Sequence, residues 1–337
     1  MPMIQEHFKK IFVGKDAFND ILGQDSVKQE MKSALLIGRH ILIIGPPGIG
    51  KTTFAKNVAK LLPDMEVNDC PYHCDSKHPV CPECKQGKSK IKKIPGAQRF
   101  VRIQGSPDLT AEDLIGDIDP AKAMQYGPLS IEAFSPGKIF KANNGVLFFD
   151  ELNRCPEKLQ NALLQALQEG YVTIGSYDVD LQTNFIFIAT MNPDDSNTER
   201  ISDVLLDRFD VLYMDYPEKL ETEIKIVEKA GKKLVECPEK LLMLGTLFVR
   251  LLREHKDVEK APSVRASIGL YERAQSNAFL AGRNKVNGKD LQDAIISVIA
   301  HRIKLKPSVS YITSELDFIK EQMKQFMSEH EKKGDLT

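Results

Sequence analysis

The sequence predicts an α/β protein with a parallel-sheet core, a C-terminal all-helical domain and a small cysteine-rich insertion. Apolar segments typical of buried strands recur at residues 41–44, 146–151 and 185–190, with helix-compatible segments between them. From Glu218 onward the pattern changes to amphipathic helices alone. These helices are expected at residues 219–233, 238–254, 263–282 and 288–304. The expected domains are a core of residues 1–216, a helical lid at 217–306 and a tail at 307–337.

A helical pattern at residues 16–36 leads into the first strand, and a phosphate-binding loop (P-loop) follows that strand. Residues 45–53 have the sequence GPPGIGKTT, which contains the pattern G-x-x-x-x-G-K-[ST] between a strand and a helix. Glycines let backbone N–H groups surround phosphate oxygens, Lys51 adds positive charge, and Thr52 can bring its hydroxyl to Mg²⁺. The loop therefore predicts ATP binding by a P-loop NTPase. The expected nucleotide-binding residues are Gly45, Pro46, Pro47, Gly48, Ile49, Gly50, Lys51, Thr52 and Thr53.

Two adjacent carboxylates end the strand at residues 146–151. Asp150 and Glu151 stand where a buried strand meets the surface, and open α/β sheets bind their ligands at that edge. Asp150 is therefore the expected Mg²⁺ ligand. Glu151 is expected to polarise the attacking water, because phosphoryl transfer asks the protein mainly for positioning and charge stabilisation. Together with the loop, the two carboxylates predict hydrolysis of ATP to ADP and phosphate.

The remaining core elements follow in order. Residues 68–96 form the cysteine-rich insertion, and a strand at 99–104 resumes the core. Residues 107–137 are acidic and punctuated by glycine and proline, and their length predicts a short helix among them.

The next elements complete the core. A helix is expected at 156–169, because apolar residues recur there with helical period. Residues 171–182 contain two short β-prone runs around a glycine and predict a β-hairpin. The strand at 185–190 ends near Asn192, which is expected to face the nucleotide from the neighbouring strand tip.

The insertion contains a candidate metal site. Its four thiols are Cys70, Cys74, Cys81 and Cys84, and they fall within fifteen residues. Four thiolates can close a tetrahedral structural Zn²⁺ site, and so polar an insertion has little apolar surface with which to fold unaided. An iron–sulfur cluster is the alternative, whereas disulfides are disfavoured in a reducing compartment. His73 or His78 could replace one cysteine, and Cys155 and Cys237 stand alone as core or surface thiols.

Composition sets broad limits on the protein. The 337 residues, 42% of them hydrophobic, allow a sizeable core in two or three domains. No apolar stretch approaches the roughly 20 residues that span a bilayer, and the N-terminus lacks the apolar region of a secretory signal, so we expect a cytoplasmic protein. The net charge of −1 provides no global field for nucleic acid, although residues 85–102 are locally basic.

The tail is expected to form one more helix. Ser314 and Asp317 form a possible capping box at its start. Its apolar residues alternate in spacing between four and three: Ile312, Leu316, Ile319, Met323 and Phe326. Such a stripe favours packing against the chain's own lid, and a coiled-coil contact with a partner is the alternative.

The ordered set of motifs resembles the AAA+ ATPases, and more closely the branch that contains the MoxR-type ATPases and the magnesium-chelatase I subunit. The resemblance covers roughly residues 15–305. The segments that carry it are ILGQD at 21–25, GPPGIGKTT at 45–53, GDIDPAKAM at 116–124, VLFFDELNR at 146–154, FIATMNP at 187–193, LLDRFD at 205–210 and PSVRA at 262–266. In that branch an insertion and a hairpin project into the central channel of a ring, and here they resemble residues 108–137 and 171–182.

The resemblance implies roles for several polar residues. Asn192 resembles sensor 1, which orients the lytic water, and Arg265 resembles the lid arginine of sensor 2; whether Arg265 acts within its own subunit is open. Arg208 resembles the arginine finger delivered to a neighbouring subunit, and Arg154 a further intersubunit arginine. Such a finger is worth about 10³ to 10⁵ in rate where it has been measured.

ILGQD resembles the segment that lines the adenine pocket, with Ile21 and Gln24 as the expected contacts, although Ile21 could equally be an ordinary core residue. A finger acting in trans implies a homo-oligomeric ring, and the resemblance implies a hexamer.

The function expected from this resemblance is an ATP-driven motor that remodels a protein or a protein–cofactor complex, with a partner that carries a von Willebrand factor A domain. An alternative is insertion of Mg²⁺ or Co²⁺ into a tetrapyrrole; the cysteine insertion departs from the typical chelatase subunit and weakens that transfer. A nucleic-acid motor resembling the minichromosome maintenance helicases is disfavoured, because residues 171–182 contain no lysine or arginine. A nucleotide-gated scaffold with little turnover is the remaining alternative.

Overall fold

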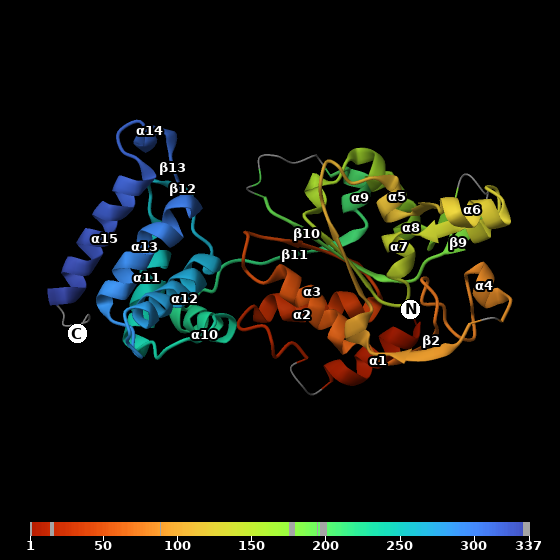
Figure 1. Cartoon of the computed structure of the whole chain (residues 1–337), viewed down its shortest axis with the longest axis horizontal. Helices are drawn as coiled ribbons and strands as arrows, with labels where there is room; N and C mark the ends of the chain where they lie inside the picture. Colours follow the sequence, from red (N-terminus) through yellow and green to blue (C-terminus); the bar gives the residue numbers. More distant parts are fainter. Residues whose placement is uncertain are drawn as a thin grey trace. The chain divides into compact units, whose positions relative to one another are not determined.

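The structure is a computed structural model that describes residues 2–13, 17–87, 89–174, 179–193, 195 and 201–332. Its chain divides into two compact units (Figure 1). The core unit contains Met1–Gly45 and Gly50–Met214, and the second unit contains Asp215–Thr337 together with Pro46–Ile49. Among the helices that the structure describes, none is both long and apolar enough to cross a membrane.

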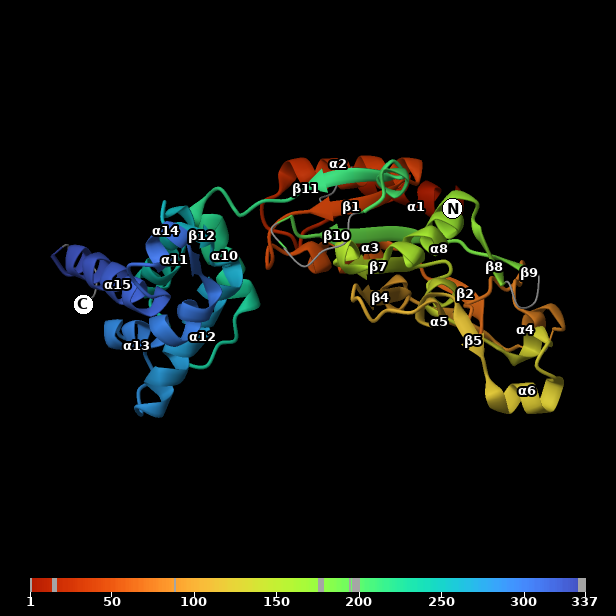
Figure 2. The ribbon, with the colours of Figure 1, turned by 90° about the horizontal axis from the view of Figure 1, so that it is seen from above.

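The core unit is built on a five-stranded sheet with the order β11-β1-β10-β7-β4 (Figure 2). All four neighbouring pairs are parallel, as the sequence predicts for an α/β core. The strands are β1 (His40–Ile44), β4 (Phe100–Gln104), β7 (Val146–Asp150), β10 (Ile186–Met191) and β11 (Phe209–Tyr213). The edge strand β11 is absent from the strands that the sequence pattern predicts. Parallel register brings the carboxyl ends of the strands to one edge, where the two carboxylates lie.

Helices cover both faces of this sheet. In Figure 1, α2 (Asp25–Ile37) and α3 (Lys51–Leu61) lie on one side, and α7 (Lys138–Lys141) and α8 (Glu157–Gln168) lie on the other. Alternate strand residues therefore enter different layers, and one buried cluster joins side chains of the sheet to those of α7 and α8. Its members from these elements include Leu42, Leu147, Phe149, Phe187, Phe140 and Leu163.

Short antiparallel pairs extend from the core. The pair β2 (Met65–Asn68) and β3 (Ile91–Ile94) brackets the cysteines, and β5 (Gly116–Ile118) pairs with β6 (Phe134–Pro136). Between β5 and β6 lies α6 (Pro120–Tyr126), so the predicted helix within residues 107–137 is confirmed. The predicted hairpin is also confirmed as β8 (Tyr171–Ile174) and β9 (Val179–Gln182), with its turn at residues 175–178 outside the described residues.

The other helices of the core unit are short, apart from the first. They are α1 (Pro2–Phe12), α4 (Pro82–Lys85), α5 (Ala111–Leu114) and α9 (Asp203–Leu206), with 3-10 turns at Gly96–Gln98, Ile131–Ala133 and Leu152–Arg154.

The second unit is predominantly helical, as the sequence pattern from Glu218 predicts. Its four main helices are α10 (Leu220–Ala230), α11 (Glu239–Glu254), α12 (Val264–Leu280) and α13 (Gly288–Ile299). The smaller elements are β12 (Val258–Lys260), a 3-10 turn at Ala300–Arg302, β13 (Lys304–Leu305) and α14 (Pro307–Ser310). Glu223 is fully buried here, and it is satisfied by Arg253, Arg250 and the Ser267 hydroxyl.

The tail helix α15 (Glu315–Lys332) packs against its own unit. The predicted cap forms, because the Asp317 N–H donates to the Ser314 hydroxyl at 3.2 Å. Two residues of the predicted stripe do not pack: Ile312 is 85% exposed and Leu316 is 40% exposed. The buried face keeps Ile319 and Phe326 of the predicted stripe, with Met323 partly buried beside them, and adds Phe318 and Met327. Ile312 does not pack because the helix starts only at Glu315.

Removal of the Phe326 ring should destabilise the second unit. Phe326 is 5% exposed and its ring centroid lies 5.2 Å from that of Phe248. Phe326→Ala is therefore expected to lower the free energy of unfolding by about 3 kcal/mol, whereas Leu316→Ala on the exposed side should lower it by less than about 1 kcal/mol. The chain has no tryptophan, so urea unfolding is best followed by circular dichroism. Equal losses in the two variants would contradict this packing.

Candidate functional site

The predicted phosphate loop connects β1 to α3. Gly45 follows the strand, Gly50 occupies the N-cap position, and α3 begins at Lys51. Gly48 and Gly50 have φ angles of 78° and 102°, which residues with a Cβ atom rarely adopt. The Lys51 ammonium donates to the Gly45 carbonyl, so it lies over the loop. Backbone N–H groups at a helix start, a lysine and a first-turn hydroxyl at Thr52 form a donor set that fits the phosphates and the Mg²⁺ of a nucleotide.

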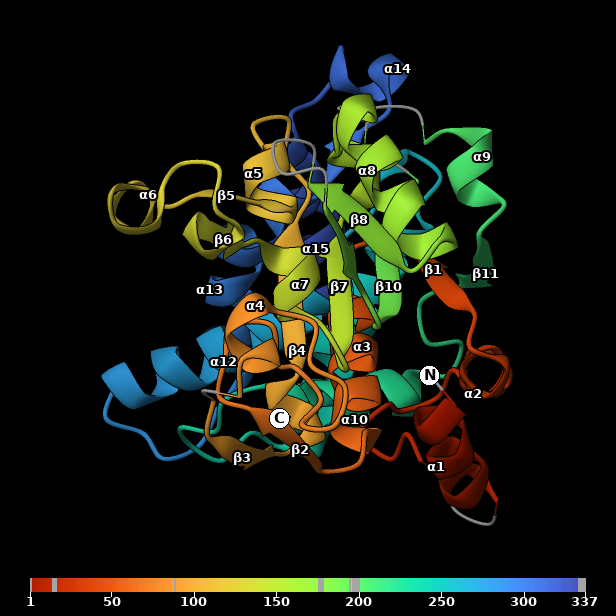
Figure 3. The same ribbon diagram turned by 90° about the vertical axis from the view of Figure 1, so that its right-hand side faces the viewer.

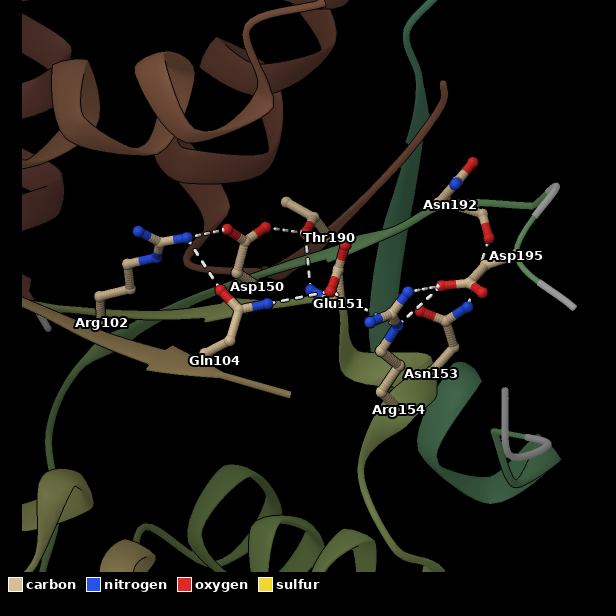
Figure 4. A network of polar contacts seen from close by, with 9 residues as sticks. All are labelled: Arg102, Gln104, Asp150, Glu151, Asn153, Arg154, Thr190, Asn192 and Asp195. Carbon is tan, nitrogen blue, oxygen red and sulfur yellow. Dashed lines mark hydrogen bonds and ion pairs between the residues drawn. The ribbon is translucent and has the colours of Figure 1, made fainter. Parts of the chain in front are cut away.

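The two predicted carboxylates lie at the tip of β7 (Figure 4). The Thr190 hydroxyl, on the neighbouring strand β10, donates to Asp150 Oδ1 at 2.7 Å and accepts from the Glu151 N–H at 3.0 Å. Glu151 has a φ angle of 59°, and a Cβ atom on Gly105 would lie 2.0 Å from its carbonyl oxygen. Hence Thr190 and Gly105 fix the backbone turn that separates the two carboxylates.

Two residues of β4, which the sequence reasoning missed, contact these carboxylates (Figure 4). Arg102 Nη2 donates to Asp150 Oδ2 at 2.6 Å and to Gln104 Oε1 at 2.9 Å. Gln104 Nε2 in turn donates to Glu151 Oε2 at 2.9 Å. Positions 102 and 104 share one side of the strand, and Gln104 is opposite Asp150 in the register. Their alternation on the predicted strand 99–104 places both side chains on one side of that strand, but only the pairing of β4 with β7 shows which carboxylates they face.

A second group of polar contacts lies beyond Glu151. Asn192 follows β10, and its carbonyl accepts from Asn153 Nδ2 at 3.3 Å. Arg154 Nε donates to Asp195 Oδ2 at 2.7 Å and lies 3.5 Å from Glu151 Oε2. The structure therefore gathers Asp150, Glu151, Asn192 and Arg154 in one polar network (Figure 4). Asn153 and Asp195 were not predicted.

Four other predicted residues are not among the contacts of this network. Arg208 follows α9, is 33% exposed, and donates to Asp207 and to Gln168, each at 3.0 Å. Arg265 is an exposed residue in the first turn of α12 in the second unit. Ile21 is 7% exposed, and Gln24 precedes α2 with a φ angle of 59°.

The four cysteines of the insertion come together as one cluster. Their sulfur atoms all lie within 4.8 Å of one another, and all four residues are buried. Backbone N–H groups point at these sulfurs: Cys74 N–H donates to Cys70 Sγ, and the N–H groups of Val80 and Cys81 donate to Cys74 Sγ, each at 3.4 Å. Hydrogen bonds from the Cys70 and Cys81 thiols, followed by those from the N–H groups of Cys81 and Val80, lower the pKa of Cys74. Such a cluster fits a metal that binds thiolates.

The cysteine module, residues 68–96, packs on the core through aromatic side chains. Figure 3 shows β2, β3 and α4 grouped near β4. The Tyr72 ring lies 5.8 Å from that of Phe140 on α7, and Phe140 lies 6.1 Å from Phe134 on β6. Arg99 is buried and donates to the carbonyls of Pro63 and Asn144. Tyr72 of the module therefore packs on α7, which in turn packs on β6 of the insertion that carries α6.

The remaining two cysteines behave as isolated thiols. Cys155 is buried in the core cluster, and burial raises the pKa of its thiol to about 12. Burial also raises the pKa of Cys237 to about 11. Both groups stay protonated near neutral pH, which fits the expected packing role.

Three family models match successive parts of the chain. Residues 17–95 match the magnesium chelatase, subunit ChlI, model. Residues 88–211 match the model of the ATPase family associated with various cellular activities (AAA), and residues 250–318 match the AAA lid domain.

Curated relatives and a solved structure agree with these models. A magnesium-chelatase subunit ChlI homolog of Methanocaldococcus jannaschii is 28% identical over 325 residues, covering 86% of each chain. The Bacillus subtilis protein YeaC, whose function is uncharacterized, is 28% identical over 331 residues and covers 91% of this chain and 87% of its own. The RuvB Holliday junction branch migration motor of Thermotoga maritima is 17% identical, covers 86% of this chain and 74% of its own, and has a TM-score of 0.50, which shows a shared fold.

The sheet, the P-loop, the paired carboxylates and the lid define this chain as an AAA+ ATPase. The matched models and relatives run through both units. Within this class, the chain is similar to the magnesium-chelatase subunit ChlI.

Proposed function

We propose that this protein hydrolyses ATP and uses the turnover to remodel a protein or a protein–cofactor complex. The observation that carries the proposal is the placement of Asp150 and Glu151 at the tip of β7. Thr190 contacts both residues and holds the two carboxylates apart. In the same sheet, β1 leads into the P-loop. Asp150 can bind the metal while Glu151 faces the attacking water. A scaffold without turnover would not need this division of roles.

In the proposed mechanism, Lys51 and the loop N–H groups would bind the phosphates, and Thr52 and Asp150 would hold Mg²⁺. Bound Mg²⁺ neutralises phosphate charge. Glu151 takes a proton from water as its oxygen attacks the γ-phosphorus, and the bond to the β-γ bridging oxygen breaks to leave ADP and phosphate. Asn192 would orient that water. Ile21 and Gln24 would line the adenine pocket.

Three arginines would complete the site. Arg208 would act as a finger in the neighbouring subunit, Arg154 as a further intersubunit contact, and Arg265 as the lid arginine. Among the described residues, the hydrogen-bond partners of Arg208 are an exposed aspartate and a glutamine. Breaking these contacts costs little free energy, so Arg208 can leave them to bind a phosphate. Arg154 is engaged by Asp195 within its own chain, and an intersubunit role requires that pair to open.

Assembly into a ring, which we propose to be a hexamer, follows from a finger that acts in trans. The steady-state ATPase rate per protomer should therefore rise with protein concentration and level off once rings are complete. Rates measured across a dilution series, alongside the mass of the assembly by light scattering, check this. A rate per protomer that is independent of concentration while the mass changes would overturn the proposal.

A chelatase role is the second candidate, because the model matched at residues 17–95 and several relatives are magnesium-chelatase subunits. In that case the motor would drive Mg²⁺ or Co²⁺ insertion into a tetrapyrrole held by other subunits. We prefer the remodelling role with a partner that carries a von Willebrand factor A domain, since the cysteine module departs from the typical chelatase subunit. Reconstitution with a chelatase catalytic subunit separates the two, because only a chelatase subunit would produce metallated tetrapyrrole.

We further propose that Cys70, Cys74, Cys81 and Cys84 hold one structural Zn²⁺. A tetrahedral ion with Zn–S bonds of about 2.3 Å separates its sulfurs by about 3.8 Å. The sulfur atoms here lie within 4.8 Å of one another, so small rotations of the side chains suffice. An iron–sulfur cluster would hold the thiolates farther apart, because iron and sulfide ions stand between them. The spacing therefore favours a single ion.

Metal removal should loosen the module and the neighbouring insertion while the nucleotide loop stays folded. Native protein is expected to contain one zinc per chain by elemental analysis, and Cys81→Ser should lose it. Hydrogen exchange should then increase at residues 70–84, and at 116–136, because Tyr72 of the module packs on Phe140 of α7 and Phe140 packs on Phe134. Cys237→Ser is the matched control and should keep the metal. Iron with acid-labile sulfide, or unchanged exchange after metal loss, would contradict the zinc proposal.

A further inference from the structure

We propose that Arg102 is a positioning residue whose guanidinium neutralises the charge of Asp150 when no nucleotide is bound. Mg²⁺ must then displace Arg102 from Asp150 when ATP binds. This inference rests on the proposed role of Asp150 as the Mg²⁺ carboxylate. It adds a residue of β4 to a site otherwise built from the P-loop, β7 and β10.

The geometry shows that Asp150 has both oxygens engaged. Oδ2 accepts from Arg102 Nη2 at 2.6 Å, and Oδ1 accepts from the Thr190 hydroxyl at 2.7 Å. The hydroxyl is neutral and belongs to the sheet that fixes the carboxylate. The guanidinium is the cationic partner, so it satisfies the charge of Asp150 and keeps the side chain aimed at the strand edge.

Arg102 is also the partner that can leave. Its side chain is 50% exposed, whereas that of Asp150 is 15% exposed, so the released guanidinium would return to water at little cost. Gln104 Oε1 already accepts from the same nitrogen at 2.9 Å and can retain it nearby. Mg²⁺ and a guanidinium repel each other when they share one carboxylate. Occupancy by the metal and the Arg102–Asp150 ion pair therefore exclude one another.

A competing cation raises the Mg²⁺ concentration that the site needs. Arg102→Met should lower the half-saturating Mg²⁺ concentration for binding of a fluorescent ADP analogue by roughly two- to fivefold, the range expected for a half-exposed ion pair. Arg102→Lys keeps the charge and should stay near wild type. The analogue's affinity in EDTA should not change in either variant, which reports that the fold and the P-loop are intact.

A matched control identifies the cause. Arg39→Met removes another exposed arginine, paired with Asp210 at 3.8 Å, and should leave the Mg²⁺ requirement unchanged. An unchanged or higher Mg²⁺ requirement in Arg102→Met overturns the inference. If Asp150→Asn does not raise the requirement, the metal assignment itself is wrong, and the inference falls with it for that separate reason.

Discussion

Glu151→Gln is expected to lower kcat for ATP by roughly 10² to 10⁴, the usual contribution of a positioned general base, while ATP still binds. The substitution keeps the side-chain shape, and its amide oxygen can still accept from Gln104 Nε2, which now binds Glu151 Oε2 at 2.9 Å. Thr190 contacts the backbone of residue 151, so the turn should not change. Only the capacity to take a proton from water is lost. Single-turnover rates and nucleotide affinity, measured together, separate chemistry from binding.

Glu157→Gln provides the control for this experiment. Glu157 is an exposed residue in the first turn of α8, so its loss removes an equal charge without touching the strand tip. Its rate should stay within twofold of wild type, as expected of a surface change. Comparable rates for Glu151→Gln and wild type would remove the assigned base, and if both rates were negligible, the nucleotide-gated scaffold would be the better account. The same variant, loaded with ATP, is also the form in which a client should remain bound for affinity purification.

The sequence predicts the P-loop and the two carboxylates because each is specified by a short stretch of consecutive residues. A P-loop motif needs one strand and one helix, both adjacent in the chain, and Gly48 and Gly50 adopt the positive φ angles that the motif requires. Asp150 and Glu151 follow an apolar run that can only be a buried strand. In each case the information lies within about ten residues, so no long-range pairing has to be known.

Features that depend on pairing between distant segments escaped prediction. Arg102 and Gln104 contact the carboxylates only because β4 pairs with β7, which lies more than forty residues later in the chain. The edge strand β11 likewise forms only because it pairs with β1, which lies far from it in the sequence. Periodicity alone gives no neighbour order in a sheet, because strand order is set by packing of the whole domain.

The tail shows a different limit of the pattern. A stripe of apolar residues predicted the helix and its cap, but it included Ile312, which precedes the helix and is 85% exposed. Hydrophobic spacing cannot tell where a helix starts to within a turn. The observed face keeps Ile319 and Phe326 and extends to Phe318 and Met327, so the pattern was wrong about the start of the helix and not about its buried side.

Arg208→Ala is expected to reduce the ATPase rate by about 10³ to 10⁵ through loss of the arginine finger. The guanidinium binds Gln168 and Asp207 within its own chain, and exposed contacts of this kind are worth less than about 1 kcal/mol, so folding should be preserved. Gln168→Ala is the matched control, because it removes the in-chain partner and keeps the finger. Its rate should remain near wild type, which would exclude a purely structural role for Arg208.

Mixing two inactive variants tests whether the finger acts between subunits. Lys51→Ala lacks a competent phosphate loop but keeps Arg208, whereas Arg208→Ala keeps the loop but lacks the finger. In a randomly mixed ring of equal parts, roughly a quarter of the head-to-tail interfaces combine an intact loop with an intact finger, and turnover should return in proportion. Each variant alone should be inactive at every concentration. If the mixture is also inactive although mixed rings form, Arg208 acts within its own chain, and the trans-acting site is the wrong account of this ATPase.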